Sequence, residues 1–235
     1  MKCGELLCIC CMAMLLFLTA CQSDWAARGY RQYQRGNYDR AIRDFGITLR
    51  SDPTNTTALF FRALSFEQIG RNDSALSDFQ SALETAPSLA YVYVARAELY
   101  YRTHDFTNAM SDYMKALDIG FSDSRLYCGY AWLLAACPDS KLRNGHSALE
   151  VARQAVALKA DIYSYCVLAA ALAEVGDYPA AVEATRTARQ MVNVNNQFSL
   201  LKRIDWCLAL YEAQEPWRPK DDTDVTMPGV EHQQW

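Results

Sequence analysis

A set of small and aromatic residues returns every 34 residues, and this period constrains the fold more than any other feature of the chain. The first copy comprises Gly36, Ala41, Phe45, Leu49 and Pro53. The second comprises Gly70, Ala75, Phe79, Leu83 and Pro87, and the third has His104, Ala109, Tyr113, Leu117 and Phe121. A fixed period of this length predicts a stack of similar supersecondary units, each contacting mainly its neighbours.

Each unit resembles the tetratricopeptide repeat, a hairpin of two helices. The first unit carries the signature residues Trp25, Gly29, Gly36, Tyr38, Ala41, Phe45 and Pro53. Small residues such as Gly29 and Ala41 let the two helices cross closely, and Gly36 ends the first helix with a left-handed backbone. The resemblance implies an all-α fold, a tetratricopeptide α–α superhelix, in which the first helices line a concave groove.

We predict about five units between residues 21 and 192, spanning 22–55, 56–89, 90–123, 124–160 and 161–192. A capping helix is expected within 193–218, because Leu200, Leu201, Ile204, Leu208 and Tyr211 form an apolar stripe at helical spacing. Residues 219–235 are acidic and have the composition of a disordered tail.

The fourth unit departs from the period. Ala-Trp-Leu-Leu-Ala at 131–135, Cys-Pro-Asp at 137–139 and Arg-Asn-Gly at 143–145 resemble a variant repeat of bacterial tetratricopeptide proteins. We place an insertion of about four residues in the loop after Cys137. In that variant the cysteine is a buried loop residue with no assigned chemistry, and the resemblance implies the same for Cys137.

The N-terminus is predicted to be a signal peptide over residues 1–20. Lys2 precedes an apolar run from Leu6 to Leu18, which is too short for a comfortable membrane span. Leu18-Thr19-Ala20-Cys21 resembles the bacterial lipobox, which implies cleavage before Cys21 and fatty acylation of that residue. The alternative is an ordinary secretory signal. Gln22 favours the outer membrane, facing the periplasm, in the rule known from enterobacterial lipoproteins.

The composition offers little support for catalysis or for nucleic-acid binding. The net charge is -4, and no cluster of lysine and arginine marks a nucleic-acid footprint. None of the three histidines has a partner at metal-ligand spacing, and no body cysteine pair has CxxC spacing. We expect Cys128 and Cys166 to be unbridged. No nucleophile motif, phosphate-binding loop or dinucleotide fingerprint occurs, so we predict no enzyme, metal or cofactor.

The repeat register predicts a binding surface on the first helix of each unit. Nine residues project toward the groove in this register: Tyr30, Tyr33, Phe60, Leu64, Tyr91, Val94, Tyr101, Trp132 and Tyr163. Large aromatic residues with a polar group are enriched in protein-binding hot spots. The alternative is that many of them fill the core between units.

These observations favour a membrane-anchored scaffold for protein–protein interaction, an adaptor or assembly factor that binds a protein or peptide. Two alternatives stay open. The chain could be a permanent structural subunit of a cell-envelope complex, or it could bind a small ligand or glycan through the same aromatic residues.

Overall fold

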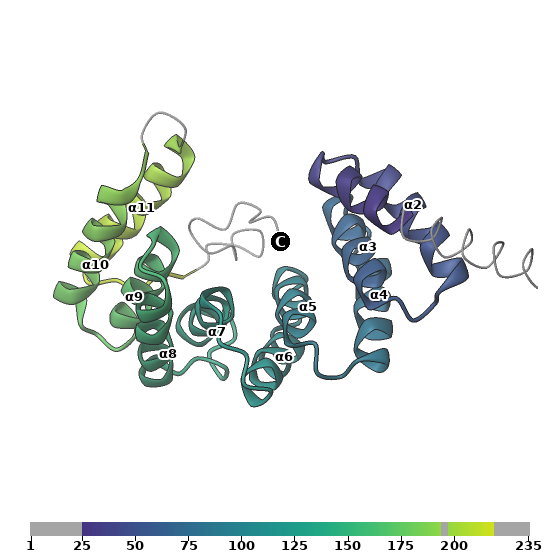
Figure 1. The fold of residues 1–235 in the computed structure, drawn as a ribbon. Helices are drawn as coiled ribbons and strands as arrows, with labels where there is room; N and C mark the ends of the chain where they lie inside the picture. The colour runs from purple at the N-terminus through teal and green to yellow at the C-terminus, as the bar shows by residue number, and fades with distance from the viewer. Residues whose placement is uncertain (1–24, 194–196, 219–235) are drawn as a thin grey trace, which may run out of the picture. The chain divides into compact units, whose positions relative to one another are not determined.

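The computed structural model describes residues 25–193 and 197–218, and over these residues it contains helices and turns but no strand. Residues 25–34 are helical and precede the labelled helices (Figure 1). These are α2 (Tyr38–Ser51), α3 (Thr56–Gln68), α4 (Asn72–Thr85), α5 (Ala90–Arg102), α6 (Phe106–Asp118), α7 (Ser124–Ala136), α8 (Gly145–Leu158), α9 (Ile162–Glu174), α10 (Tyr178–Met191) and α11 (Phe198–Glu212). The contacts divide the chain into two compact units, residues 1–92 and 93–235, which we describe separately.

In the first unit, short turns join residues 25–34 to α2 and α3 to α4, and α3 also packs against α2. The crossing of the first pair depends on Gly29, since a Cβ atom there would lie 2.8 Å from the Phe45 ring. Phe45 is buried against this gap. Gly36 and Gly70 hold φ angles of 73° and 75° in the two turns, a left-handed backbone that glycine adopts at little cost.

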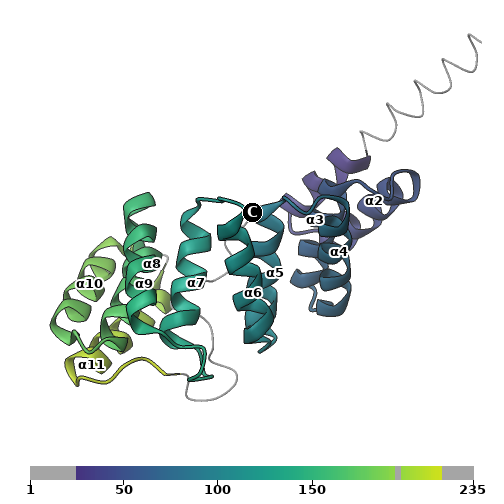
Figure 2. The ribbon, with the colours of Figure 1, turned by 90° about the horizontal axis from the view of Figure 1, so that it is seen from below.

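The second unit repeats this hairpin and then alters it. His104 occupies the turn between α5 and α6 with φ 65°, so the left-handed turn is kept without glycine. Residues 137–144 form the longer connection between α7 and α8, and Asn144 caps α8 by accepting a hydrogen bond from the Ser147 amide. Figure 2 shows α8, α9 and α10 side by side, in agreement with their contacts.

The last helix closes the second unit. Ile204, Cys207 and Tyr211 of α11 are buried, and Ile204 packs in a core cluster with Cys166, Ala188 and Val192. Leu200, Leu201 and Leu208 are half-buried. Within the predicted apolar stripe, Ile204 and Tyr211 are therefore buried, whereas the three leucines remain partly exposed.

Four cysteines lie in the described residues: Cys128, Cys137, Cys166 and Cys207. All are buried, and Cys128, Cys137 and Cys166 are free thiols. Three sequence predictions fall outside the described residues: the signal peptide, the lipidated Cys21 and the tail 219–235.

Candidate partner-binding site

Four aromatic side chains from successive first helices form a continuous series in the first unit. Tyr30 lies on residues 25–34, Phe60 and Phe61 on α3, and Tyr91 at the start of α5. The ring centroids of Tyr30 and Phe61 are 4.8 Å apart, those of Phe61 and Phe60 5.2 Å, and those of Phe60 and Tyr91 4.8 Å. Each pair is edge-to-face, the arrangement that the ring quadrupole favours. We call these four residues the aromatic ladder.

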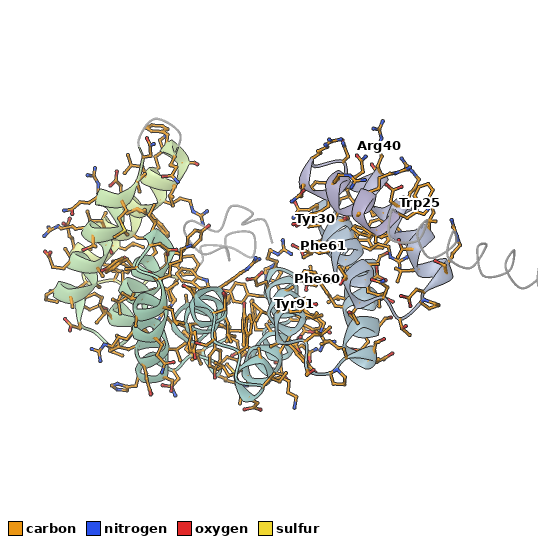
Figure 3. The ribbon with its side chains drawn as sticks, in the orientation of Figure 1. Trp25, Tyr30, Arg40, Phe60, Phe61 and Tyr91 are labelled. Atoms are coloured by element: carbon orange, nitrogen blue, oxygen red, sulfur yellow. The ribbon has the colours of Figure 1, made fainter. Side chains whose placement is uncertain are left out.

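The ladder combines buried supports with accessible edges. Phe60 is only 4 % exposed and its ring also packs on Phe79, whereas Phe61 reaches Phe45 and Tyr33. Tyr30 is 37 % exposed, and Phe61 and Tyr91 are half-buried. Figure 3 shows the four labelled residues along one edge of the unit. Buried rings hold the accessible ones in fixed positions, which lowers the entropy cost of binding a partner.

Partial burial also affects the tyrosine hydroxyl. Desolvation raises the pKa of Tyr91, so this side chain stays a neutral hydrogen-bond donor and acceptor at physiological pH. An edge of this kind can contact an apolar side chain and hydrogen-bond a peptide backbone at the same time.

The structure separates the nine predicted groove residues into two groups. Tyr30, Tyr91 and Tyr163 retain accessible surface. Six are buried: Tyr33, Phe60, Leu64, Val94, Tyr101 and Trp132. These six support the helix packing. Because they are buried, they can affect binding only by positioning the accessible residues beside them. Sequence reasoning missed Phe61, although its place directly after Phe60 in an aromatic pair was a visible signal.

In the second unit two of the predicted aromatics, Tyr101 and Trp132, pack inward. The Trp132 ring lies 4.8 Å from Trp217, which belongs to the segment after α11 and is itself 2 % exposed. Tyr101 packs edge-to-face on Phe106, with a centroid distance of 5.2 Å, and burial raises its pKa. Trp132 thus fixes the return of the C-terminal segment onto α7.

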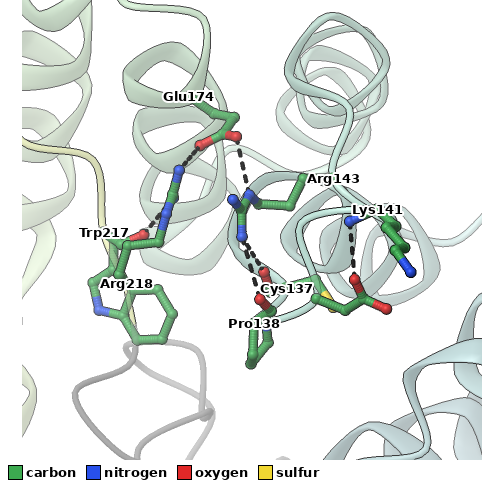
Figure 4. A network of polar contacts seen from close by, with 8 residues as sticks. Cys137, Pro138, Lys141, Arg143, Glu174, Trp217 and Arg218 are labelled. Carbon is green, nitrogen blue, oxygen red and sulfur yellow. Dashed lines mark hydrogen bonds and ion pairs between the residues drawn. The ribbon is translucent and has the colours of Figure 1, made fainter.

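A polar network joins the loop after α7 to the same C-terminal segment (Figure 4). Arg143 donates to the Cys137 carbonyl at 2.8 Å and to Glu174 at 3.2 Å. Arg218 donates to the other oxygen of Glu174 at 2.6 Å. Burial raises the pKa of the Cys137 thiol, which therefore lacks the thiolate character of a nucleophile. The Arg143 contacts give the inserted loop a structural role.

Three ion pairs repeat with the period of the sequence. Arg28 pairs with Asp44, Arg62 with Asp78 and Arg96 with Asp112, each through two hydrogen bonds of 2.7 or 2.8 Å. Each pair joins the two helices of one hairpin. Sequence reasoning missed them, although the 34-residue spacing of the arginines and of the aspartates could have revealed them.

A cavity of about 430 Å³ lies between α10 and α11. Its lining residues are Arg186, Arg189, Gln190, Asp205, Leu208, Ala209 and Glu212. Arg186 pairs with Glu212 and Arg189 pairs with Asp205 across it. Because the opposite charges pair with each other, the cavity presents no unbalanced charge to a ligand.

Among the described residues, no group of three histidine, cysteine, aspartate or glutamate residues could hold a metal ion. None of the described helices combines the length and the apolar character needed to cross a membrane.

Comparison with known proteins gives the same repeat. A tetratricopeptide-repeat family model matches residues 26–90 and 66–124. The structure of TTC0263, a thermophilic TPR protein of Thermus thermophilus, superimposes with a TM-score of 0.62 at 20 % identity, covering 80 % of this chain and 100 % of that one. No curated protein sequence matches significantly.

Two further structures are similar. A MamA protein aligns with a TM-score of 0.60 at 16 % identity, covering 76 % of this chain and 94 % of that one. YrrB, described as a TPR protein with an unusual peptide-binding site, aligns with a TM-score of 0.58 at 19 % identity, covering 72 % and 82 %. At these identities the likeness concerns the fold.

Proposed function

Because the chain has the tetratricopeptide-repeat solenoid fold and residues 26–124 match the repeat family, we propose that it is a membrane-anchored scaffold that binds a protein partner. The observation that carries the proposal is the aromatic ladder. Tyr30, Phe61 and Tyr91 offer accessible aromatic edges on a surface held by buried packing. This surface fits an extended or helical segment with apolar side chains. The peptide-binding site named for YrrB supports a peptide as the ligand class.

A photo-crosslinking residue in place of Tyr30 tests this proposal. Irradiation of native membranes is expected to give a covalent adduct of defined mass, which mass spectrometry then identifies. The same probe at Leu158, 48 % exposed on α8, serves as the control for random collisions. Adding Tyr91→Ala should reduce the Tyr30 adduct while the helical circular dichroism is retained. Equal adducts at both positions, or none at Tyr30, would overturn the assignment of the ladder.

The anchor is a separate part of the proposal. Cys21 is preceded by Leu18-Thr19-Ala20 and by an apolar run, which supports a lipid-modified cysteine in a bacterial envelope and, with Gln22, an outer-membrane position facing the periplasm. Labelling cells with a fatty-acid analogue tests it. Wild-type protein should take up label, and Cys21→Ala should not. A labelled Cys21→Ala protein would refute the lipobox interpretation.

A permanent structural subunit is the second candidate. Met191 and Phe198, at the end of α10 and the start of α11, are 41 % and 60 % exposed and could lie against a fixed neighbour. Purification in mild detergent distinguishes the two. A partner retained in constant stoichiometry favours the subunit, and its loss on dilution favours the scaffold with a transient partner.

A further inference from the structure

The first repeat has a charge opposite to that of the whole chain. Residues 25–51, the helical hairpin of this repeat, have a net charge of +4, and the whole repeat 22–55, which adds Asp24 and Asp52, has +2, whereas the 235-residue chain has -4. The basic residues are all arginines: Arg28, Arg31, Arg35, Arg40, Arg43 and Arg50. The acidic residues of the hairpin are Asp39, which is exposed, and Asp44, which is buried in its pair with Arg28. The exposed surface of this hairpin is therefore predominantly basic.

Three of these arginines form a stripe on α2. Arg40, Arg43 and Arg50 follow helical spacing on one face and extend over about 15 Å. All three are exposed, and among the described residues none of them pairs with a carboxylate. In Figure 3 the labelled Arg40 points outward, away from Phe60 and Tyr91 of the aromatic ladder. The arginine stripe and the ladder are thus separate surfaces of one unit.

The stripe lies on the part of the fold nearest in sequence to the apolar N-terminus. The run Leu6–Leu18 and Cys21 precede Trp25 by only a few residues. An extended chain reaches at most about 15 Å over the four residues from Cys21 to Trp25, and at most about 25 Å over the seven from Leu18. Whether a lipid on Cys21 or the apolar run itself enters the bilayer, the first repeat must stay close to the headgroups.

The chemistry of the repeat suits a phosphate-rich surface. Arginine forms bidentate hydrogen bonds with phosphate and is more weakly hydrated than lysine. Trp25 is half-buried with the Arg28 guanidinium 4.2 Å from its ring centroid, and tryptophan favours the membrane interface. A nucleic acid or an acidic protein would also attract arginines. The neighbouring apolar run and Trp25 favour a membrane over either of them.

We propose that the Arg40–Arg43–Arg50 stripe binds the anionic headgroups of phospholipids and so provides a second membrane contact beside the N-terminal anchor. It rests on the proposed membrane attachment for its proximity to lipid. Each basic side chain near an anionic bilayer adds about 1 kcal/mol of binding, and a lipid chain combined with a basic patch anchors better than either alone. A fixed surface on a folded repeat would also orient the protein on the membrane.

Vesicle flotation of the full-length chain tests the proposal. One set of vesicles contains phosphatidylcholine alone, and the other contains equal amounts of phosphatidylcholine and phosphatidylglycerol. The unprocessed chain keeps Leu6–Leu18, and insertion of an apolar run does not depend on headgroup charge, so the difference between the sets reports headgroup recognition. We expect tighter binding to the anionic vesicles. R40Q/R43Q/R50Q should reduce that preference by on the order of tenfold or more, and high salt should reduce it in the wild type.

A second triple variant, K115Q/K141Q/R153Q, changes the net charge equally at exposed positions outside the first repeat. It should keep the preference for anionic vesicles. Equal loss in both triples, or no preference in the wild type, would overturn the proposal, as would binding of the stripe to RNA or an acidic protein without vesicle preference. Circular dichroism confirms that each variant is folded.

The outcome is separable from that of the proposed function. Cys21→Ala removes the lipid but leaves the stripe, so it should keep the preference for phosphatidylglycerol. Tyr91→Ala should reduce the adduct formed by the probe at position 30 without changing flotation. A failure of the scaffold proposal therefore leaves the lipid-binding result interpretable, and the reverse also holds.

Discussion

Replacing Arg96 with methionine is expected to destabilise the protein more than the same change at Arg62 or Arg28. The three arginines make the same bidentate pair, and their aspartate partners are all buried. The arginine side chains are 48 % exposed at Arg28, 24 % at Arg62 and 12 % at Arg96. Water can therefore replace Arg28 beside Asp44 more easily than it can replace Arg96 beside Asp112.

The magnitudes follow from this gradient. Removing one partner of a buried ion pair costs about 3–5 kcal/mol, because the other charge is left uncompensated, whereas an exposed pair contributes about 1 kcal/mol or less. We expect a loss of about 3 kcal/mol for Arg96→Met, about 1 kcal/mol for Arg28→Met and an intermediate value for Arg62→Met. For a chain of this size, the Arg96 loss lowers Tm by roughly 6–12 °C.

Thermal unfolding followed by far-ultraviolet circular dichroism measures the series. The double variant Arg96→Met/Asp112→Leu should regain most of the stability, because an apolar pair leaves no buried charge. The Arg96 guanidinium also lies 5.6 and 5.8 Å from the ring centroids of Tyr93 and Tyr100, and methionine keeps an apolar contact there. Equal losses at the three positions, or a double variant no more stable than Arg96→Met, would refute the reasoning.

Three further predictions concern backbone and burial. Gly29→Ala should destabilise by about 1–3 kcal/mol, because its Cβ would lie 2.8 Å from the Phe45 ring, whereas Gly46→Ala, with 3.9 Å of room, should stabilise; urea midpoints check both. His104→Gly should raise Tm by relieving the left-handed strain, while His104→Ala should not. Burial raises the pKa of Cys128 to about 12, so the folded chain keeps a proton that the unfolded chain has lost. Unfolding free energy should therefore fall as pH rises from about 9 toward 12, and less so in Cys128→Ala; the same slope in both would contradict this.

Much of the fold could be predicted from the sequence, because each unit carries the same packing residues at the same spacing and so forms the same helical hairpin. Helix α7 begins at Ser124, the predicted start of the fourth unit, and α8 begins at Gly145, after the insertion predicted to follow Cys137. The helix α11, Phe198–Glu212, lies within the range 193–218 predicted for the capping helix. Helix ends depend on single capping hydrogen bonds, such as that of Asn144, which spacing alone locates only approximately.

The third turn has His104 where the first two repeats have Gly36 and Gly70. The structure keeps the same left-handed geometry, with φ 65° against 75° at Gly70. The flanking helices fix the path of the turn, and the residue at its centre has to adopt it. Local preference therefore determines the energy of this turn, and the packing determines its shape.

The candidate site was less predictable. The repeat register brought Tyr30, Phe60 and Tyr91 to one surface, but it could not distinguish an accessible ring from a buried one. Phe60 and Phe61 are adjacent in sequence, yet their side chains differ by about 100° around the helix, so one supports the core and the other stays half-open. Accessibility depends on the side chains of neighbouring helices, which the register of a single unit does not contain.

The sequence by itself therefore determined the repeating hairpin, its period and its interruption after Cys137. The tertiary structure decided which aromatic residues remain accessible, which arginines pair with aspartates and which, as on α2, keep their charge exposed. The physical reason is the sequence separation of the contacts involved. A repeat encodes contacts between residues at fixed spacing, whereas burial and ion pairing depend on where side chains from separate helices meet.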